Sequence, residues 1–183
     1  MKAQVEAMRL LEEADQLFGE DAVREAVVRI GAEISEKLKD DFPVVLSVMG
    51  GAAIFTGQLL PLLRFPLEFG AIEVTRYNND IQGREITWRL PPRDNVRGRV
   101  VLVVDDILDE GITLAAIKQR LLEMGAKQVY SAVFADKAIG RDKPVTADFV
   151  GVTVPNRYVF GFGMDAYGLW RNLPAIYALK EQE

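Results

Sequence analysis

Hydrophobic residues recur along the chain at two different spacings, which predict helices and strands in turn. Over residues 4–18 and 22–38 they recur every three or four positions, the spacing of helices with one buried face. Asp21 lies where the N-cap of the second helix is expected. Further along, short apolar runs alternate with helical patterns. The predicted strands span 43–48, 67–77, 99–104 and 128–135, and the predicted helices span 52–63 and 113–124.

Strands that alternate with helices indicate an α/β fold, with a mainly parallel central sheet flanked by helices. Gly125 follows the helix predicted over 113–124, at the position where helix C-caps favour glycine. A chain of 183 residues without internal repeats or an interdomain linker is expected to form a single domain.

The most apolar predicted strand runs directly into a group of acidic residues. Residues 99–104 are RVVLVV, and carboxylates follow at Asp105, Asp106, Asp109 and Glu110. The helix dipole accounts for one or two carboxylates before a helix, but four within six residues repel one another. A divalent cation or the hydroxyl groups of a ligand would relieve that repulsion, and open α/β folds bind ligands at this edge of the sheet.

The second half of the same loop, residues 109–113, opens the next helix. Unpaired amides at a helix N-terminus bind anions, and the small Gly111 lets a phosphate approach closely. One loop therefore offers amides to a phosphate and carboxylates to hydroxyls or Mg²⁺, which binds oxygen ligands. A phosphorylated sugar has both kinds of group.

Composition narrows the function classes. The net charge is −5 and no dense run of Lys and Arg occurs, which argues against a nucleic-acid surface. Cys and His are absent, so carboxylates, Lys and Tyr remain for acid–base chemistry, without disulfides or thiolate metal sites. Acidic residues interrupt the N-terminal segment, and no apolar run approaches the roughly 20 residues of a membrane span. We expect a cytoplasmic enzyme or regulator.

Other nucleotide-binding folds are disfavoured, because neither a GxGxxG motif after a strand nor a P-loop occurs. Two segments leave alternatives open at this point. Residues 78–84 (NNDIQGR) are typical of a surface hairpin loop, but also suit a lid over a site. Residues 155–174 are rich in aromatics and glycine, and form either a small packed appendage or a flap that covers a ligand.

Four segments, in this order, resemble the type I phosphoribosyltransferases, and in particular their hypoxanthine-guanine branch. VVLVVDDILDEGITL (100–114) is similar to the signature that binds the diphosphate sugar. The other three are LSVMGGAAIF (46–55), similar to the pyrophosphate loop, EVTRYNND (73–80), similar to the start of the mobile catalytic loop, and residues 147–174, similar to the purine-binding hood. The resemblance covers about residues 40–175. It implies N-terminal helices over 1–40, a core over 41–135, and a hood with the C-terminal segment over 145–183.

The resemblance also implies roles for the matched residues. Asp105 and Asp106 would bind the ribose hydroxyls, Asp109 would accept the purine N7 proton, and 109–113 would surround the 5′-phosphate, with the Thr113 hydroxyl. The implied site for phosphoribosyl diphosphate and nucleotide comprises Asp105, Asp106, Ile107, Leu108, Asp109, Glu110, Gly111, Ile112 and Thr113. The implied pyrophosphate contacts are Met49, Gly50, Gly51 and Arg171, and the mobile-loop residues are Arg76, Tyr77 and Asn78. The purine would contact Tyr158 by stacking, Val159 through its backbone, and Asp165; the implied Mg²⁺ ligands are Asp105, Asp106 and Asp165.

Three positions depart from the family pattern. Met49 stands where many relatives have Lys or Arg, and the Glu110 side chain is expected to point away from the phosphate. Thr146 replaces the Lys expected to bind the purine 6-oxo group, so Lys143 or Lys137 is expected to substitute. The bond between Val48 and Met49 is expected to be a non-proline cis peptide, by analogy with relatives.

The implied activity converts hypoxanthine and guanine, with phosphoribosyl diphosphate and Mg²⁺, to IMP and GMP with release of pyrophosphate. We expect neither a nucleic-acid partner nor a membrane, and assembly as a homodimer or homotetramer. Two alternatives remain: a phosphoribosyltransferase for another base, such as xanthine or a pyrimidine, and a regulator that retains the fold and binds RNA or a repressor.

Overall fold

Six strands form the large central sheet of the computed structural model, which describes residues 2–76 and 86–180. The strands lie in the order β4-β3-β2-β5-β6-β7, and all neighbours are parallel except β3 and β4. Their bounds are β2 Val44–Met49, β3 Glu68–Arg76, β4 Ile86–Leu90, β5 Val100–Leu108, β6 Gln128–Ala138 and β7 Phe149–Pro155. The predicted mainly parallel α/β fold is confirmed.

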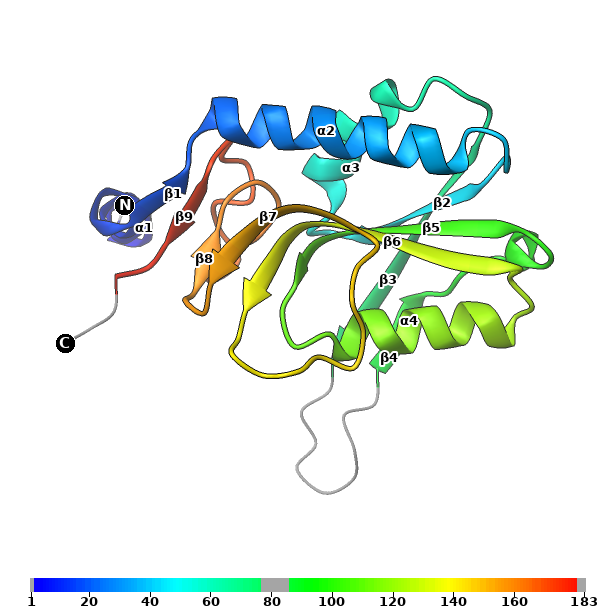
Figure 1. Cartoon of the computed structure of the whole chain (residues 1–183). Coiled ribbons are helices and arrows are strands. Elements are labelled where there is room, and N and C mark those ends of the chain that lie inside the picture. Colours follow the sequence, from blue (N-terminus) through cyan, green and yellow to red (C-terminus); the bar gives the residue numbers. More distant parts are fainter. Residues whose placement is uncertain (1, 77–85, 181–183) are drawn as a thin grey trace.

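Helices cover both faces of this sheet (Figure 1). Their bounds are α1 Lys2–Glu13, α2 Glu20–Leu38, α3 Ala53–Leu59 and α4 Ile112–Glu123, with 3-10 turns η1 Leu60–Leu62 and η2 Asp94–Val96. The helices α2 and α3 pack on one face and α4 packs on the other. None of the helices within the described ranges is long and apolar enough to cross a membrane.

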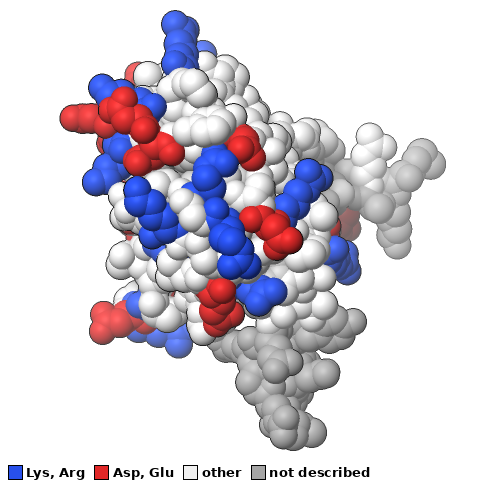
Figure 2. Space-filling model, turned by 90° about the vertical axis from the view of Figure 1, so that its right-hand side faces the viewer, with Lys and Arg blue, Asp and Glu red and all other residues white. Residues whose placement is uncertain are grey.

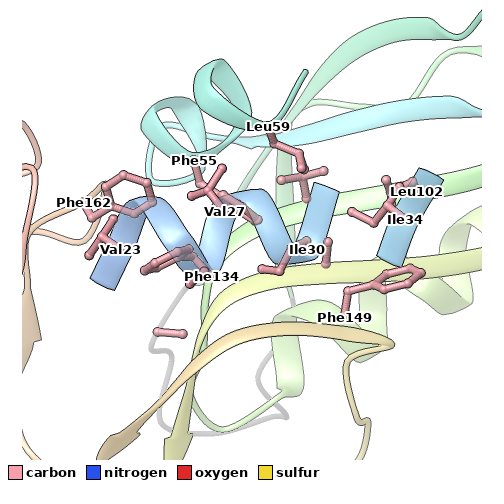
Figure 3. Packing of buried hydrophobic residues seen from close by; sticks show 14 of the residues in the cluster. Val23, Val27, Ile30, Ile34, Phe55, Leu59, Leu102, Phe134, Phe149 and Phe162 are labelled. Carbon is pink, nitrogen blue, oxygen red and sulfur yellow. The ribbon is translucent and has the colours of Figure 1, made fainter. Parts of the chain in front are cut away.

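The core between α2 and the sheet is closed by aromatic rings from distant parts of the sequence. Figure 3 shows Val27 and Ile30 of α2 above Phe134 of β6, with Phe55 and Phe162 beside them. The ring centroids of Phe134 and Phe162 are 4.3 Å apart, and both side chains are fully buried. Because Phe162 belongs to the hood segment, this packing fixes the hood against the end of the large sheet.

A second, three-stranded sheet joins the two ends of the chain. It has the order β1-β9-β8 with antiparallel pairs, formed by β1 Asp15–Phe18, β8 Val159–Phe160 and β9 Ile176–Ala178. The prediction of a helix through residue 18 was wrong, because residues 15–18 pair with β9 and this tertiary pairing outweighs the local helical spacing. The expected division into N-terminal helices, core and hood is corrected too. β1 of the N-terminal segment lies in the three-stranded sheet with β8 and β9 of the hood, and β7 lies in the six-stranded sheet of the core.

Several predicted boundaries shift in the structure. Gly19, and not Asp21, is the N-cap of α2; Asp21 lies in the first turn and pairs with Arg24. The helix predicted over 52–63 ends at Leu59 and continues as η1. Gly125 follows α4 with φ +88°, which confirms the glycine stop. The segment 78–84, expected to form a hairpin loop or a lid, lies outside the described residues.

Candidate active site

A cavity of about 280 Å³ lies where β5 and β6 end beneath the hood. It is lined by Asp106, Ile107, Asp109, Lys137, Tyr158, Val159, Met164 and Asp165. The residues come from three segments that are far apart in the sequence. Parallel strands present their carboxyl ends at one edge of the sheet, which is why the ends of β5 and β6 meet here. Six of the eight were predicted as site residues; Lys137 was an alternative, and Met164 was not predicted.

The first two acids lie within β5 and not in a loop, because the strand continues to Leu108. The amide of Asp106 donates to Asp105 Oδ1 at 2.9 Å, and the amide of Ile107 donates to Asp106 Oδ1 at 2.8 Å. Only 14% of the Asp106 side chain is exposed. This burial raises the pKa of Asp106, against the opposing effects of its hydrogen bonds and of Arg171. A positive partner would therefore stabilise the ionised form.

Asp109 forms an ion pair with Lys137 at the end of β6. The Lys137 Nζ donates to Asp109 Oδ2 at 2.9 Å, and the Lys137 side chain is only 13% exposed. Lys143 points elsewhere and bonds to the carbonyl oxygen of Leu108 and to Asp136. Thr146 lines a separate cavity behind the 137–146 segment. Of the two lysines expected to replace the missing one, Lys137 is therefore the one that lines the cavity.

The loop between Asp109 and α4 is held from outside by the 137–146 segment. Gly111 has φ +81° at the N-cap of α4, a conformation that favours glycine. A Cβ on Gly111 would lie 3.3 Å from Pro144 Cδ and 3.4 Å from Lys143 Cβ. The glycine is thus favoured by its backbone conformation and by this packing, independently of the phosphate contact expected from the sequence. The Glu110 carboxylate bonds to Arg141 at 2.7 Å, as befits a side chain expected to point away from the phosphate.

The Gly50-Gly51 turn lies beside Asp106. Gly50 has open space where a side chain would be, whereas a Cβ on Gly51 would overlap the Asp106 carboxylate. The space at Gly51, expected to admit pyrophosphate, is therefore taken by Asp106. The cis peptide joins Met49 to Gly50, one bond later than expected, because β2 stays extended through Val48 and Met49, which pair with β3.

The hood carries the remaining predicted residues. Arg171 links two carboxylates: its Nη2 lies 2.6 Å from Asp165 Oδ1, and its Nη1 lies 3.7 Å from Asp106 Oδ2. Tyr158 stacks on Tyr167, with ring centroids 5.7 Å apart and an interplanar angle of 19°. The Val159 side chain is buried. The structure thus gathers Tyr158, Val159 and Asp165 of the hood around one cavity with Asp106 and Asp109.

Comparisons with known proteins agree with this geometry. The model of the phosphoribosyl transferase domain matches residues 13–167. The chain belongs to the phosphoribosyl transferase family. The hypoxanthine-guanine phosphoribosyltransferase of Bacillus subtilis is 33% identical over 165 residues, which cover 90% of this chain and 92% of the relative. The hypoxanthine-guanine-xanthine phosphoribosyltransferase of Tritrichomonas foetus is 34% identical, over 90% of this chain and 91% of the relative.

Solved structures agree as well. A hypoxanthine phosphoribosyltransferase from Staphylococcus aureus superposes with a TM-score of 0.84 at 25% identity, over 92% of this chain and 93% of that one. The family and the branch expected from the sequence are both confirmed.

The acids of this phosphoribosyl transferase fit a Mg²⁺ ion that is shared with a substrate. Among residues 2–76 and 86–180, no three carboxylates gather closely enough to hold a metal by themselves. Asp105 and Asp106 are nevertheless adjacent carboxylates near the end of β5, and Mg²⁺ is usually bound by one or two carboxylates together with phosphates and waters. Asp165 is bonded to Arg171 and to the Gly168 amide.

Lys137 and Tyr167 carry contacts that the sequence analysis did not assign. Lys137 had a positional signal, since it lies near the end of the strand that follows the acid-bearing one. Tyr167 had none, because its contact depends on a turn between Asp165 and Leu169. Of the mobile-loop residues, Arg76 ends β3, whereas Tyr77 and Asn78 lie outside the described residues.

On the face shown in Figure 2, basic and acidic side chains are interspersed, without a continuous basic surface. The net charge of the whole chain is −5.

Proposed function

We propose that this protein transfers the phosphoribosyl group from phosphoribosyl diphosphate to hypoxanthine and guanine, which yields IMP and GMP and releases pyrophosphate. The observation that carries the proposal is the cavity that places the Asp109–Lys137 pair opposite Tyr158. The relatives named above carry the same activity in their names.

In this proposal the base lies in the cavity beneath Tyr158. The aromatic ring of Tyr158 stacks on the purine, and stacking between aromatic rings tolerates either purine. The Lys137 ammonium donates to the 6-oxo group, which hypoxanthine and guanine share. Asp109 accepts the N7 proton once the ammonium turns toward the base.

The sugar lies along the end of β5 in the same proposal. Asp105 and Asp106 accept hydrogen bonds from the ribose hydroxyls, and the amides at the start of α4 surround the 5′-phosphate. Loss of pyrophosphate from C1′ develops positive charge on the ribose. Carboxylates nearby stabilise that charge, and the bound geometry aligns the base for attack. The absence of His and Cys from the chain is compatible with this chemistry.

Mg²⁺ belongs to the proposal as a cofactor. The oxygens of Asp105 and Asp106 would hold it, and Asp165 would face a second ion. Bound there, Mg²⁺ would supply positive charge against the diphosphate, which would make pyrophosphate a better leaving group. A Cβ on Gly50 would meet nothing within 4 Å, so pyrophosphate would have room to approach the backbone there, and Arg171 would supply a positive charge.

A panel of bases tests the proposal. Pyrophosphate release is measured with phosphoribosyl diphosphate, MgCl₂ and one base at a time: hypoxanthine, guanine, xanthine, adenine, uracil or orotate. We expect release with hypoxanthine and guanine, and little with adenine, whose 6-amino group cannot accept from Lys137. Turnover of a pyrimidine alone would replace the proposed substrate, and release with no base in the panel would favour a regulator that retains the fold.

A further inference from the structure

The stacked pair of Tyr158 and Tyr167 separates two cavities. Tyr158 lines the cavity that holds Asp109 and Lys137. Tyr167 does not; it lines a second cavity of about 470 Å³ next to α1, together with Arg9 and Leu179. The ring centroids are 5.7 Å apart, the separation of two rings in direct contact. A base therefore does not fit between the rings, and it meets Tyr158 on the face that Tyr167 leaves free.

Tyr167 does not behave like an ordinary packed aromatic residue. Its side chain is 72% exposed, so burial contributes little to holding it in place. Its backbone has φ +53°, which is uncommon for a bulky residue. Strained backbone of this kind persists where the surroundings enforce it, and it clusters at functional sites. The contact that this conformation secures is the stack on Tyr158.

The turn around Tyr167 is built firmly enough to enforce that position. The Gly168 amide donates to Asp165 Oδ2 at 2.7 Å, and a β-bridge joins Ala166 to Leu169. The indole Nε1 of Trp170 donates to the carbonyl oxygen of Ala7 in α1 at 3.1 Å. The same turn carries Asp165, whose other oxygen pairs with Arg171. The position of the Tyr167 ring is therefore tied to the diphosphate side of the site and to the N-terminal helix.

We propose that Tyr167 is a positioning residue for the purine: it supports the far face of the Tyr158 ring, so that the near face is already oriented when the base arrives. The inference rests on the proposed function, because it assigns a role at the base subsite. A ring with one face supported has less conformational freedom to lose on binding, and such preorganisation improves affinity without a new contact to the ligand. Tyr158 is itself 47% exposed, and its ring stacks on that of Tyr167.

Three variants and the wild type test this role. Tyr167→Ala removes the ring, and Tyr167→Phe keeps it without the hydroxyl. Both variants keep a Cβ, so the strain of the positive φ is the same as in the wild type. Leu169→Ala is the matched control, since Leu169 is 47% exposed in the same turn and lies outside the base cavity. The KM for hypoxanthine and guanine, the KM for phosphoribosyl diphosphate, and kcat are measured for each.

We expect Tyr167→Ala to raise the purine KM about 2- to 10-fold, the range of one aromatic pair, with little change in kcat or in the KM for phosphoribosyl diphosphate. Tyr167→Phe and Leu169→Ala should behave like the wild type. An unchanged purine KM in Tyr167→Ala overturns the inference, and so do equal changes in Tyr167→Ala and Leu169→Ala, which would show that only the turn matters. A wild type without turnover of either purine overturns the proposed function, and the inference with it.

Discussion

In the proposed function, base recognition depends, at the scale of single residues, on where one ammonium group points. Lys137 is nearly buried and bonds to Asp109, whereas Lys143 bonds to Leu108 and Asp136 on the outer side of the same loop. The two lysines are six positions apart and chemically identical. They form a matched pair for mutation.

We expect Lys137→Ala to raise the KM for hypoxanthine and guanine by about 10- to 100-fold, because hydrogen bonds to charged groups contribute about 1.5–3 kcal/mol. Discrimination against adenine should fall as well. Lys143→Ala should leave the purine KM nearly unchanged. Steady-state kinetics on both variants provides the measurement, and the opposite pattern would assign base recognition to Lys143.

Asp106, a proposed binding residue, is expected to oppose the stability of the fold. Its carboxylate is buried, so the ionised form is disfavoured in the folded protein without ligands. Asp106→Asn keeps the shape of the side chain and removes the charge. We expect an unchanged or higher Tm at pH 7, together with a KM for phosphoribosyl diphosphate raised about tenfold or more. A Tm lowered by several degrees would show that the charge supports the fold.

The sequence alone groups the acidic residues at this scale, because Asp105, Asp106 and Asp109 are neighbours along one strand and loop, and their roles stay predictions. It could not decide between Lys137 and Lys143, because both lie beyond the strand predicted over 128–135. The stack of Tyr158 on Tyr167 could not be predicted from the sequence for another reason. It depends on the left-handed backbone of Tyr167, which no local pattern indicates.

At the scale of helices and strands, the start of α4 offers a direct test, because its conformation depends on one glycine. Gly111 combines a positive φ with close packing against Pro144. Gly57 of α3 offers a contrast, since it is exposed and has open space around its Cβ position. The same substitution at these two glycines should change stability in opposite directions.

Gly111→Ala should lower the free energy of unfolding by about 1–2 kcal/mol, the cost of a left-handed conformation for an L-residue. It should also weaken GMP binding, because the amides around the 5′-phosphate shift. Gly57→Ala should raise stability by about 0.5–1 kcal/mol, as alanine is favoured over glycine inside a helix. Urea denaturation measures both. Equal effects of the two substitutions would contradict the account of Gly111.

Most elements followed from periodicity, and the exceptions share a cause. Residues 15–18 continue a helical pattern but form β1, and residues 105–108 are polar in part but extend β5. Residues 15–18 pair with β9, which is distant in the sequence. Residues 105–108 pair with β6, although their polar side chains disguise them as a loop. Local patterns do not report such pairing, which the partner strands β9 and β6 decide.

The whole molecule is closed by contacts between its two ends. β1 adds to β9, and the Arg157 guanidinium bonds to Asp15 at 2.6 Å and to the carbonyl oxygen of Leu179 at 2.7 Å. Arg157 directly precedes Tyr158. The N-terminal segment, which the motifs did not cover, therefore belongs to the support of the purine site.

We expect Asp15→Asn to cost about 1–2 kcal/mol of stability, because the Arg157 side chain is only 21% exposed and would lose its charged partner. Hydrogen exchange in β1 and β9 should become faster than in the large sheet. Asp21→Asn is the control, since it breaks the exposed pair with Arg24 and should cost almost nothing. The same loss in both variants would mean that the Asp15 contact does not join the ends of the chain.

The most direct test of the whole account is the turnover of Asp109→Asn. Asp109 lies between the β5 acids and the amides of α4, and bonds to Lys137 in the purine cavity. General-base catalysis typically contributes about 10²- to 10⁴-fold. We predict that kcat with hypoxanthine falls by about that factor, whereas the KM for phosphoribosyl diphosphate stays within a few-fold. A near-normal kcat would contradict the account, because the cavity would then lack the proton acceptor on which the proposed reaction depends.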